Sequence, residues 1–367
     1  MTVSFRQPAR SRERWVRRPM NNNFPVSPTE ASPSAPPGRW YRRINLFLVG
    51  LPAAIFLAWC FPGPGSRAGL FTLSTLSLVG ISAVFFGYGL RTDWDQFMAG
   101  IRLWRMHLLI QFITFLLFPL LIFPWKWVLV QDTAQQIWLG IFFLAALPST
   151  ISSSAVLVSM AGGNLPLAVV NAGLSGLIGI LATPFWMVLT GSHFEGGWGA
   201  LGLASLRLSI IIFLPMLVGA ALTPWLGVFA RRHERFLRMA DQMVVMLIVY
   251  TSFSKSFERG LPAVFTVTAL AAAAVAVSVL FLVVAALILG FCRLRQIPKP
   301  ETLTVFFCGS TKSLSHGVVM AKVLFGSQPM AALVIVPVMF YHFIQITALS
   351  LAAAVNQPFS RWFFPPE

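Results

Sequence analysis

Long apolar segments recur along most of this chain, and no other feature of the sequence constrains its fold as strongly. Of the 367 residues, 57% are apolar and 10% are charged, whereas an ordinary soluble protein carries about 25% charged residues. A helix of about 20 apolar residues can cross a hydrocarbon core about 30 Å thick. The apolar runs are continuous instead of alternating, which disfavours a membrane β-barrel. The sequence therefore predicts an all-α polytopic membrane protein.

Ten of these segments are predicted to cross the membrane as helices. They cover residues 44–62, 68–90, 106–124, 136–160, 164–190, 206–226, 237–256, 262–291, 302–325 and 328–355. The preceding residues 1–43 contain nine arginines and two glutamates and have no apolar period, so we expect a disordered basic arm in the cytoplasm. Residues 356–367 form a short cytoplasmic tail in this scheme.

The distribution of charge supports the ten-span count. A formal net charge of +16 would suggest a nucleic-acid partner in a soluble protein. Here the basic residues cluster between the spans and in the arm, with twenty on the inner side of the ten-span scheme and five on the outer side. Because basic loops stay in the cytoplasm, we expect both termini there. The chain is predicted to be a multi-pass protein of the cell (inner) membrane with no nucleic-acid partner.

The ten spans divide into two sets of five, residues 44–190 and 206–355, which have opposite orientations. Inverted repeats of this kind are typical of secondary transporters. A repeated polar motif supports the pairing, since STISSS at 149–154 lies in the fourth span and STKSLS at 310–315 in the ninth. Hydroxyl residues occupy the same four positions of both motifs. A turn signal and a proline follow each motif, within 162–166 and 326–329.

Both motifs are suitable places for a helix to break near the middle of the membrane. Serine and threonine favour helix ends over helix interiors, and Pro148 disfavours helical geometry at Leu147. A break exposes backbone groups that only protein, ion or water can satisfy at this depth. Two breaks that cross would form one polar site with positive helix N-termini. For any single serine, close helix packing is an alternative role.

Lys312 is predicted to lie deep in the ninth span. It follows the start of that span by about ten residues, or about 15 Å of helix, where a charge costs at least about 2.5 kcal/mol. All eleven carboxylates are predicted to lie outside the apolar cores. We therefore expect Lys312 to pair with carbonyl oxygens, hydroxyls or an anionic substrate, or to lose its proton. Lys322, near the outer end of the span, is expected to extend to the interface.

Further polar residues within the spans complete the candidate site. His316 follows Lys312 by four residues and Gln345 follows His342 by three, so each pair is expected to share a helical face. Tyr341 and the tryptophans near span ends are predicted to be interfacial anchors. The candidates for substrate or ion binding are Gln111, Ser152, Ser153, Ser154, Asn171, Ser310, Thr311, Lys312, Ser313, Ser315, His316, His342 and Gln345. The three cysteines lack metal-binding spacing, and no cofactor is expected.

These motifs resemble those of the bile acid:sodium symporter superfamily, and most closely its SBF-like branch of bacterial proteins and ten-span eukaryotic relatives. The resemblance rests on PSTISSS with AGGN (148–154 and 161–164), FCGSTKSL (307–314) and YHFIQ (341–345), and it covers about residues 44–355. It implies a panel domain of spans 1, 2, 6 and 7 beside a core domain of spans 3, 4, 5, 8, 9 and 10. Spans 4 and 9 would be discontinuous and would cross, and alternating access would follow from the core moving against the panel.

The resemblance also implies cation-coupled uptake of a small organic anion, with Na⁺ or H⁺ as the coupling ion. In the bile acid branch, two sodium ions lie behind the crossover. Besides the STKSL region, the matching positions here are Gln111, Ser153, Ser154 and Asn171. A glutamate of that branch is replaced here by hydroxyl residues and Lys312, and a fixed cation repels sodium. We therefore expect Lys312 to stand in for one cation, which leaves one sodium ion, a proton or no coupling ion.

Two other classes of function stay open on the sequence alone. Relatives in this branch are linked to calcium homeostasis, so the resemblance also allows a regulator of cation fluxes without large transport of its own. Ser310 and Ser313 flank Lys312, which allows a Ser–Lys hydrolase, although a nucleophile also needs suitable geometry and an oxyanion hole. The leading prediction is a transporter and not an enzyme.

Overall fold

The computed structural model describes residues 46–67, 72–91, 98, 100–129, 131–150, 152–190, 197–258, 266–325 and 330–354. Within these ranges the chain forms helices joined by turns, and no strand occurs. The predicted arm at 1–43, the tail at 356–367 and the turn signal at 326–329 lie outside the described residues. The predicted all-α class is confirmed for the part of the chain that is described.

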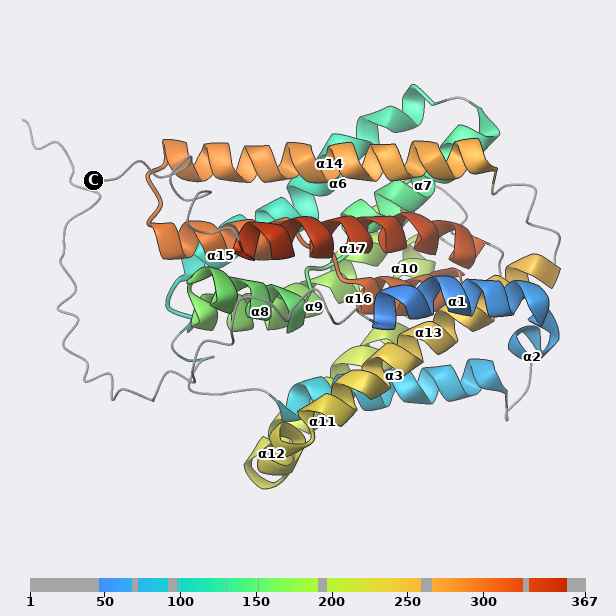
Figure 1. Cartoon of the computed structure of the whole chain (residues 1–367), viewed down its shortest axis with the longest axis horizontal. Coiled ribbons are helices and arrows are strands. Elements are labelled where there is room, and N and C mark those ends of the chain that lie inside the picture. The colour runs from blue at the N-terminus through green and yellow to red at the C-terminus, as the bar shows by residue number, and fades with distance from the viewer. Residues whose placement is uncertain are drawn as a thin grey trace, which may run out of the picture. The chain divides into compact units, whose positions relative to one another are not determined.

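Each of the ten predicted spans has a helical counterpart (Figure 1). The first five spans correspond to α1 (Leu46–Cys60), α3 (Leu73–Leu90), the continuous run α5 (Trp104–Phe112), η2 (Ile113–Leu117), α6 (Phe118–Ile122) and η3 (Phe123–Trp127), the pair α7 (Asp132–Ala146) and α8 (Ser152–Ala161), and α9 (Leu165–Leu189). The last five correspond to the continuous run α10 (Gly197–Leu208), η4 (Ser209–Phe213) and α11 (Leu214–Ala221), then α13 (Glu234–Glu258), α14 (Val267–Leu294), the pair α15 (Lys299–Gly309) and α16 (Leu314–Phe325), and α17 (Met330–Ala354). Two short helices, α2 (Pro62–Ser66) and α12 (Thr223–Arg232), follow α1 and α11.

Among the described residues, seven helices are long and apolar enough to cross a membrane, which makes the chain a polytopic membrane protein. They cover 73–90, 104–127, 165–189, 202–221, 234–258, 267–294 and 330–353. The apolar part of α1 is shorter. The helices α7, α8, α15 and α16 have 10 to 15 residues each, too few to cross a core about 30 Å thick alone. The ten-span count and the inverted repeat stay predictions.

The fourth and ninth predicted spans are both interrupted at the hydroxyl motifs. After α7, Leu147 has φ −71° and ψ 153°, the extended geometry that the following Pro148 favours. In the ninth span, α15 ends at Gly309 and α16 begins only at Leu314. Both breaks therefore lie where the sequence predicts them.

Two other prolines change the helix type locally. Pro119 and Pro215 each follow a π-helical segment, η2 and η4 respectively. Because proline has no N–H, the carbonyl four residues earlier loses its donor. Trp186 Nε1 of α9 donates to the first of these carbonyls, that of Phe115 (2.7 Å), and Ser82 Oγ of α3 donates to the second (3.2 Å). Neighbouring helices thus satisfy backbone groups that the prolines expose inside the membrane.

The helices pack in two groups. In one group, α13 packs against α1 and α3, and α3 packs against α11, while α10, which leads into α11, packs against α9 and α16 of the other group. In the other, α9, α14 and α17 pack with the two interrupted helix pairs. The helix α13 also contacts α16 and α17, so it lies where the two groups meet (Figure 1).

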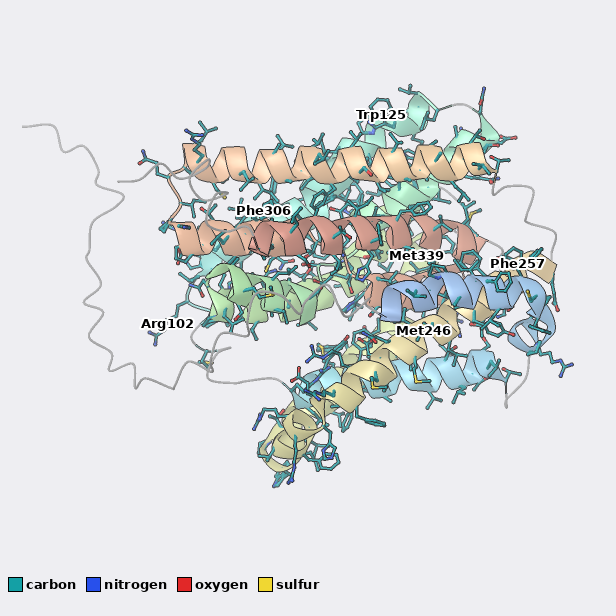
Figure 2. The ribbon with its side chains drawn as sticks, viewed as in Figure 1. Arg102, Trp125, Met246, Phe257, Phe306 and Met339 are labelled. Atoms are coloured by element: carbon teal, nitrogen blue, oxygen red, sulfur yellow. The ribbon has the colours of Figure 1, made fainter. Side chains whose placement is uncertain are left out.

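Trp125 illustrates the environment at a helix end. It lies in η3, at the end of the helix 104–127, and is 53% exposed (Figure 2). Trp125 is thus exposed at a span end, as an interfacial anchor would be. The prediction is wrong for Trp138 and Trp186, which also lie near span ends but are buried and donate to backbone oxygens of neighbouring segments.

Lys322 is half-buried and bonds to the beginning of α3. Its ammonium donates to the backbone oxygen of Ser74 (2.8 Å) and to the hydroxyl of Ser77, both on α3. These acceptors belong to a helix that is distant in the sequence, and Ser74 lies in the first turn of α3. That Lys322 reaches the membrane interface stays a prediction.

The contact between α3 and α11 yields a test of the packing. A Cβ atom at Gly89 would clash with the backbone oxygen of Met216 and lie 2.7 Å from the backbone nitrogen of Ala220. Backbone atoms cannot rotate away, so we expect Gly89→Ala to force the helices apart at a cost of about 1–3 kcal/mol and to lower the melting temperature of the purified protein. The matched control is Gly202→Ala in α10, where a Cβ meets nothing within 4 Å. Equal melting temperatures for the two variants would contradict this packing.

Candidate functional site

Lys312 lies in the non-helical segment between α15 and α16 and is 1% exposed. Its Nζ donates to the backbone oxygens of Thr114 (2.7 Å), Ala145 (2.7 Å) and Leu147 (2.8 Å). A charged ammonium has three N–H donors and no acceptor, so all three donors are used. Of the partners that the sequence leaves open, carbonyl oxygens are those observed, and three acceptors on one nitrogen fit the protonated form.

The carbonyl oxygens around Lys312 have lost their helical donors. In η2, the N–H of Phe118 donates to the oxygen of Ile113. The next residue, Pro119, has no N–H, so the oxygen of Thr114 has no donor in its own helix. The other two oxygens lie at the C-terminal end of α7, where carbonyls are unpaired and the helix dipole is negative. The ring of Phe118, with its centroid 4.1 Å from Nζ, adds a cation–π contact.

Gln345 holds the backbone of Lys312 from α17. Its Oε1 accepts from Lys312 N–H (2.8 Å), and its Nε2 lies within hydrogen-bond distance of Lys312 O (2.8 Å) and His342 Nδ1 (3.0 Å). His342 and Gln345 therefore share a helical face, as predicted. Lys312 and His316 do not, because the helix of His316 starts after Lys312; His316 Nδ1 bonds to the hydroxyl of Ser313 (2.9 Å). That prediction assumed an unbroken helix and is wrong.

The two hydroxyl motifs join the breaks directly. Ser149 Oγ donates to the oxygen of Cys308 (2.7 Å) and bonds to Thr311 Oγ1 (2.9 Å). Ser313 N–H donates to the oxygen of Pro148 (2.9 Å). Segments that are more than 150 residues apart in the sequence thus satisfy each other's exposed backbone groups, as helix breaks in a membrane require.

Tyr341 belongs to this junction and is not an interfacial anchor. It is 0% exposed, and its hydroxyl donates to the backbone oxygen of Ser310 (2.7 Å). Its ring packs edge-on against Phe118 and Phe281, with centroids 6.2 and 5.9 Å away. The prediction is wrong because the polar tip of the side chain finds a freed carbonyl inside the protein instead of water.

The geometry gives no support to a Ser–Lys hydrolase. The Nζ of Lys312 uses its three donors on carbonyl oxygens. Ser310 Oγ donates to the oxygen of Phe306 (2.6 Å), and Ser313 Oγ bonds to His316. Neither serine is therefore bonded to the amine that would have to activate it.

The predicted sodium ligands form two separately bonded groups. Gln111 Nε2 donates to Asn171 Oδ1 (2.8 Å). Ser153 Oγ donates to the hydroxyl of Thr150 (2.8 Å), and Ser154 Oγ donates to the oxygen of the same residue (2.6 Å). Among the described residues, no group of three or more His, Cys, Asp or Glu side chains could hold a metal ion. Of the other candidates, Ser152 lies in α8, but its side chain is not among those described.

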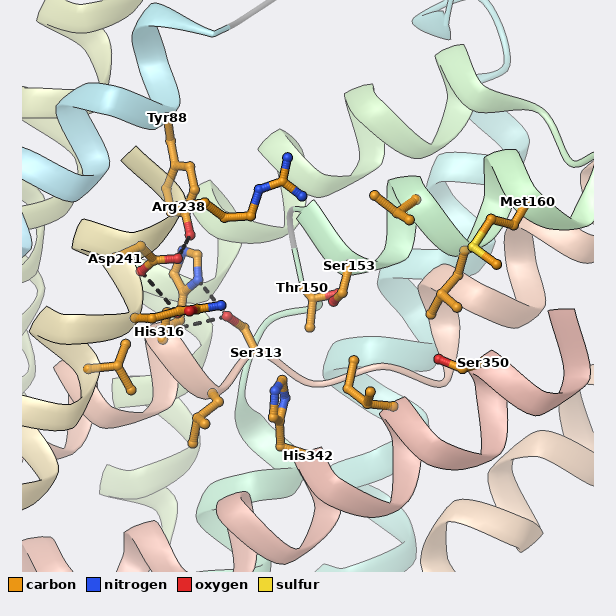
Figure 3. A pocket seen from close by; sticks show the side chains of 17 residues that line it. Tyr88, Thr150, Ser153, Met160, Arg238, Asp241, Ser313, His316, His342 and Ser350 are labelled. Carbon is orange, nitrogen blue, oxygen red and sulfur yellow. Dashed lines mark hydrogen bonds between the residues drawn. The ribbon is translucent and has the colours of Figure 1, made fainter. Parts of the chain in front are cut away.

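A cavity of about 300 Å³ lies beside the junction (Figure 3). The predicted site residues that line it are Ser153, Ser313, Ser315, His316 and His342. Thr150 also lines it and accepts from the N–H of Ser154 (3.2 Å) at the start of α8, as Ser313 accepts from that of His316 (3.2 Å) at the start of α16. Two capped helix N-termini therefore border one cavity, an arrangement that favours an anion.

The sequence did not predict the cavity-lining residues that α3 and α13 contribute. Asp241 of α13 is 9% exposed; Tyr88 donates to its Oδ2 (2.5 Å), and Ser315 donates to its Oδ1 (3.4 Å). The expectation that all carboxylates lie outside the apolar cores is therefore wrong at Asp241. The predicted seventh span, 237–256, already contained this position. Arg238, one turn earlier, also lines the cavity and pairs with Glu234 (2.5 Å).

The junction yields a test of its hydrogen bonds. We expect Tyr341→Phe to leave the buried oxygen of Ser310 without this donor and to destabilise the protein by about 1–3 kcal/mol. The matched control is Tyr250→Phe, which removes a bond of equal length, 2.7 Å, to the oxygen of Phe61 at an exposed position, where solvent can replace the donor. The comparison is the melting temperature of each purified variant. A loss at Tyr250 as large as that at Tyr341 would contradict the burial argument.

Comparison with known proteins agrees with the motifs at this junction. The model of the SBF-like CPA transporter family matches residues 45–357. The uncharacterised Pseudomonas aeruginosa protein PA2026 is 35% identical over 316 residues, which are 86% of this chain and 92% of that protein. Escherichia coli YfeH, named as a candidate symporter, is 30% identical over 85% of this chain and 93% of its own. Mouse sodium/bile acid cotransporter 7 is 26% identical over 83% and 90%. The chain belongs to the SBF-like CPA transporter family, the branch of the bile acid:sodium symporter superfamily that its motifs resemble.

Proposed function

We propose that this protein is a secondary active transporter that takes up a small organic anion by alternating access, driven by a coupling cation. The observation that carries the proposal is the junction of the two interrupted helix pairs. It places the N-termini of α8 and α16 on one cavity of about 300 Å³. A polar site built from broken helices at the centre of the membrane is typical of secondary transporters.

The cavity lining supports a small, amphipathic anion as substrate. Its volume is at the lower end of the range for small-molecule sites. Serine hydroxyls, two histidines and Arg238 supply donors, while Leu157, Met160 and Ile346 supply apolar surface. One of the relatives named above is a sodium/bile acid cotransporter. The substrate proposed here is defined only by its charge and size.

The packing of the helices supports a division into two moving parts. We assign α1, α3, α11 and α13 to the panel and the helices that pack with the interrupted pairs to the core, since these sets pack as two groups. The cavity lies between them, with α3 and α13 on one side and α8, α16 and α17 on the other. Ten spans in two inverted repeats, with both termini in the cytoplasm, complete the proposal.

Lys312 acts in this proposal as a fixed cation. Its ammonium occupies a ring of three backbone oxygens, and such rings also bind alkali cations. The site that sodium would need at this point of the crossover is thereby filled by the protein itself. The coupling ion, Na⁺ or H⁺, then binds elsewhere.

Uptake by purified protein tests the proposed function. A thermal-shift screen of small carboxylates and sulfonates, with and without sodium, identifies a stabilising anion. Proteoliposomes are then tested for accumulation of that radiolabelled anion under an inward gradient of Na⁺ or of H⁺. The proposal expects accumulation above the external concentration with at least one gradient. Equilibration alone, or no uptake of any stabilising anion, would refute secondary active transport.

Lys312→Ala tests the role of the junction in transport. We expect the variant to be less stable than the wild type, because three buried oxygens lose their donor. The protein that stays monodisperse in size-exclusion chromatography is expected to lose uptake of the anion by at least about tenfold. That loss corresponds to about 1.4 kcal/mol. The control is Lys299→Ala, which removes an exposed lysine at the start of α15. Wild-type uptake by the Lys312 variant would show that the junction is not part of the transport site.

Lys312→Ala also tests whether the ammonium of Lys312 occupies a position that sodium would otherwise bind. Removing the ammonium leaves the oxygens of Thr114, Ala145 and Leu147 without their shared donor. We expect sodium chloride, compared with choline chloride at equal ionic strength, to raise the melting temperature of Lys312→Ala more than that of the wild type. An identical response of the two proteins to sodium would contradict the stand-in role.

A further inference from the structure

We propose that Asp241 carries the coupling proton, in a hydrogen-bonded link between α13 and α16; the inference rests on the proposed transport function. Asp241 is the buried carboxylate among the described residues, and it lines the cavity. Figure 3 shows its side chain between Tyr88 and the start of α16. A buried ionisable side chain within a membrane-spanning helix is energetically costly and usually marks a functional site.

Asp241 accepts hydrogen bonds from two hydroxyl groups and has no ion pair among those found in the described residues, while Arg91 is a cation near enough to interact with it electrostatically. Tyr88 and Ser315 donate to its two oxygens at 2.5 and 3.4 Å. The ion pair found among the described residues joins Arg238 to Glu234 instead. A buried carboxylate without a paired cation is costly while it is charged. Binding one proton removes that charge, so this site can take up and release a proton where a salt-bridged aspartate could not.

The charged and titratable groups around Asp241 come from several helices. On α3, Tyr88 is the direct partner, while Arg91 lies over the Tyr88 ring at 4.9 Å and donates to the oxygen of Gly87 (3.1 Å). On α13, Arg238 is engaged by Glu234. The helices α1 and α2 contribute no charged side chain among the described residues, and the basic side chains of α12 are exposed.

Two histidines face the cavity from the other side. His316 of α16 bonds to Ser313 through Nδ1, while its Nε2 is buried without a hydrogen-bond partner. His342 of α17 bonds to Gln345 through Nδ1. Because Gln345 uses its Oε1 on Lys312 N–H, its amide nitrogen is the donor to His342. The Nδ1 atom of His342 is thus the acceptor, and its Nε2 carries the hydrogen of the neutral ring.

The position of Asp241 makes its proton state relevant to movement. Tyr88 belongs to the same packing group as Asp241, but Ser315 lies on α16, in the group of the interrupted helices. The ionised carboxylate accepts from both hydroxyls. When a proton from water in the cavity binds at Oδ1, a new O–H bond forms there and the negative charge is lost. The bond from Ser315 then weakens or reverses, because a neutral carboxyl group is a weaker acceptor than a carboxylate. On release, the proton passes to water in the cavity, and the carboxylate again attracts α16.

A proton fits this site better than a metal cation does. A bound cation needs several oxygen atoms that direct lone pairs toward it. Here both hydroxyls direct their hydrogens toward the carboxylate, which is the orientation that a cation would oppose. Sodium is therefore the alternative that the experiment has to exclude.

pH-difference infrared spectroscopy of the full-length protein in liposomes tests the proposal with the proton alone as ligand. On acidification, the wild type is expected to gain a C=O stretching band of a protonated, buried carboxylic acid, and Asp241→Asn is expected to lack it. The control is Asp132→Asn, which removes an exposed carboxylate from the first turn of α7 and should leave that band unchanged. Asp241→Glu, which keeps the carboxyl group, should restore a band at a shifted frequency even if Asp241→Asn folds poorly.

Three results would overturn the proposal. The first is an identical difference spectrum for the wild type and Asp241→Asn. The second is a band that sodium chloride removes at constant pH, because the site would then bind sodium. The third is proton-driven anion accumulation by Asp241→Asn at the wild-type level. Failure of the transport function is separate: it would show as no accumulation by the wild type, whether or not the infrared band of Asp241 is present.

Discussion

The buried ammonium group of Lys312 requires three hydrogen-bond acceptors, and the arrangement of the segments around the crossover supplies them. Each acceptor is a backbone oxygen that has lost its helical donor, one in η2 before Pro119 and two at the end of α7 before Pro148. A single side chain thereby joins three segments that are distant in the sequence. Neither the charge nor the freed carbonyls would be tolerable alone in an apolar environment. Together they account for a helix break that would otherwise destabilise the fold.

The crossover has two sides with different chemistry. On one side, Lys312, Gln345 and Tyr341 form short, fully buried hydrogen bonds that fix the broken segments to each other. On the other side, a cavity separates the junction from α3 and α13, and the long bond between Ser315 and Asp241 crosses between the two packing groups. A rigid junction beside a weak, titratable contact is what alternating access requires. In the proposed mechanism, the core moves as a unit while its contact with the panel changes.

The sequence predicts well those features that have local causes. Pro148 and the hydroxyl residues around it specify a break, and the matching motif at 310–315 specifies its partner. Partners that come from distant segments could not be predicted. Tyr341 has the sequence pattern of an interfacial anchor, but its hydroxyl bonds to Ser310 inside the protein. Likewise, the sequence gives no sign that Lys322 bonds to α3. The missed residue, Asp241, lies within the predicted span 237–256, but no sequence signal connects it with Tyr88 and Ser315.

The most direct test of alternating access at the crossover is the accessibility of one cavity residue from each side of the membrane. Ser153 lines the cavity, and Ser153→Cys can be placed in a variant whose exposed Cys60 is replaced by serine. A membrane-impermeant thiol reagent is then applied to right-side-out and to inside-out vesicles. The account predicts that the cysteine reacts from both sides, at rates that the stabilising anion changes in opposite directions. Reaction from one side only, whatever ligand or pH is used, would contradict it.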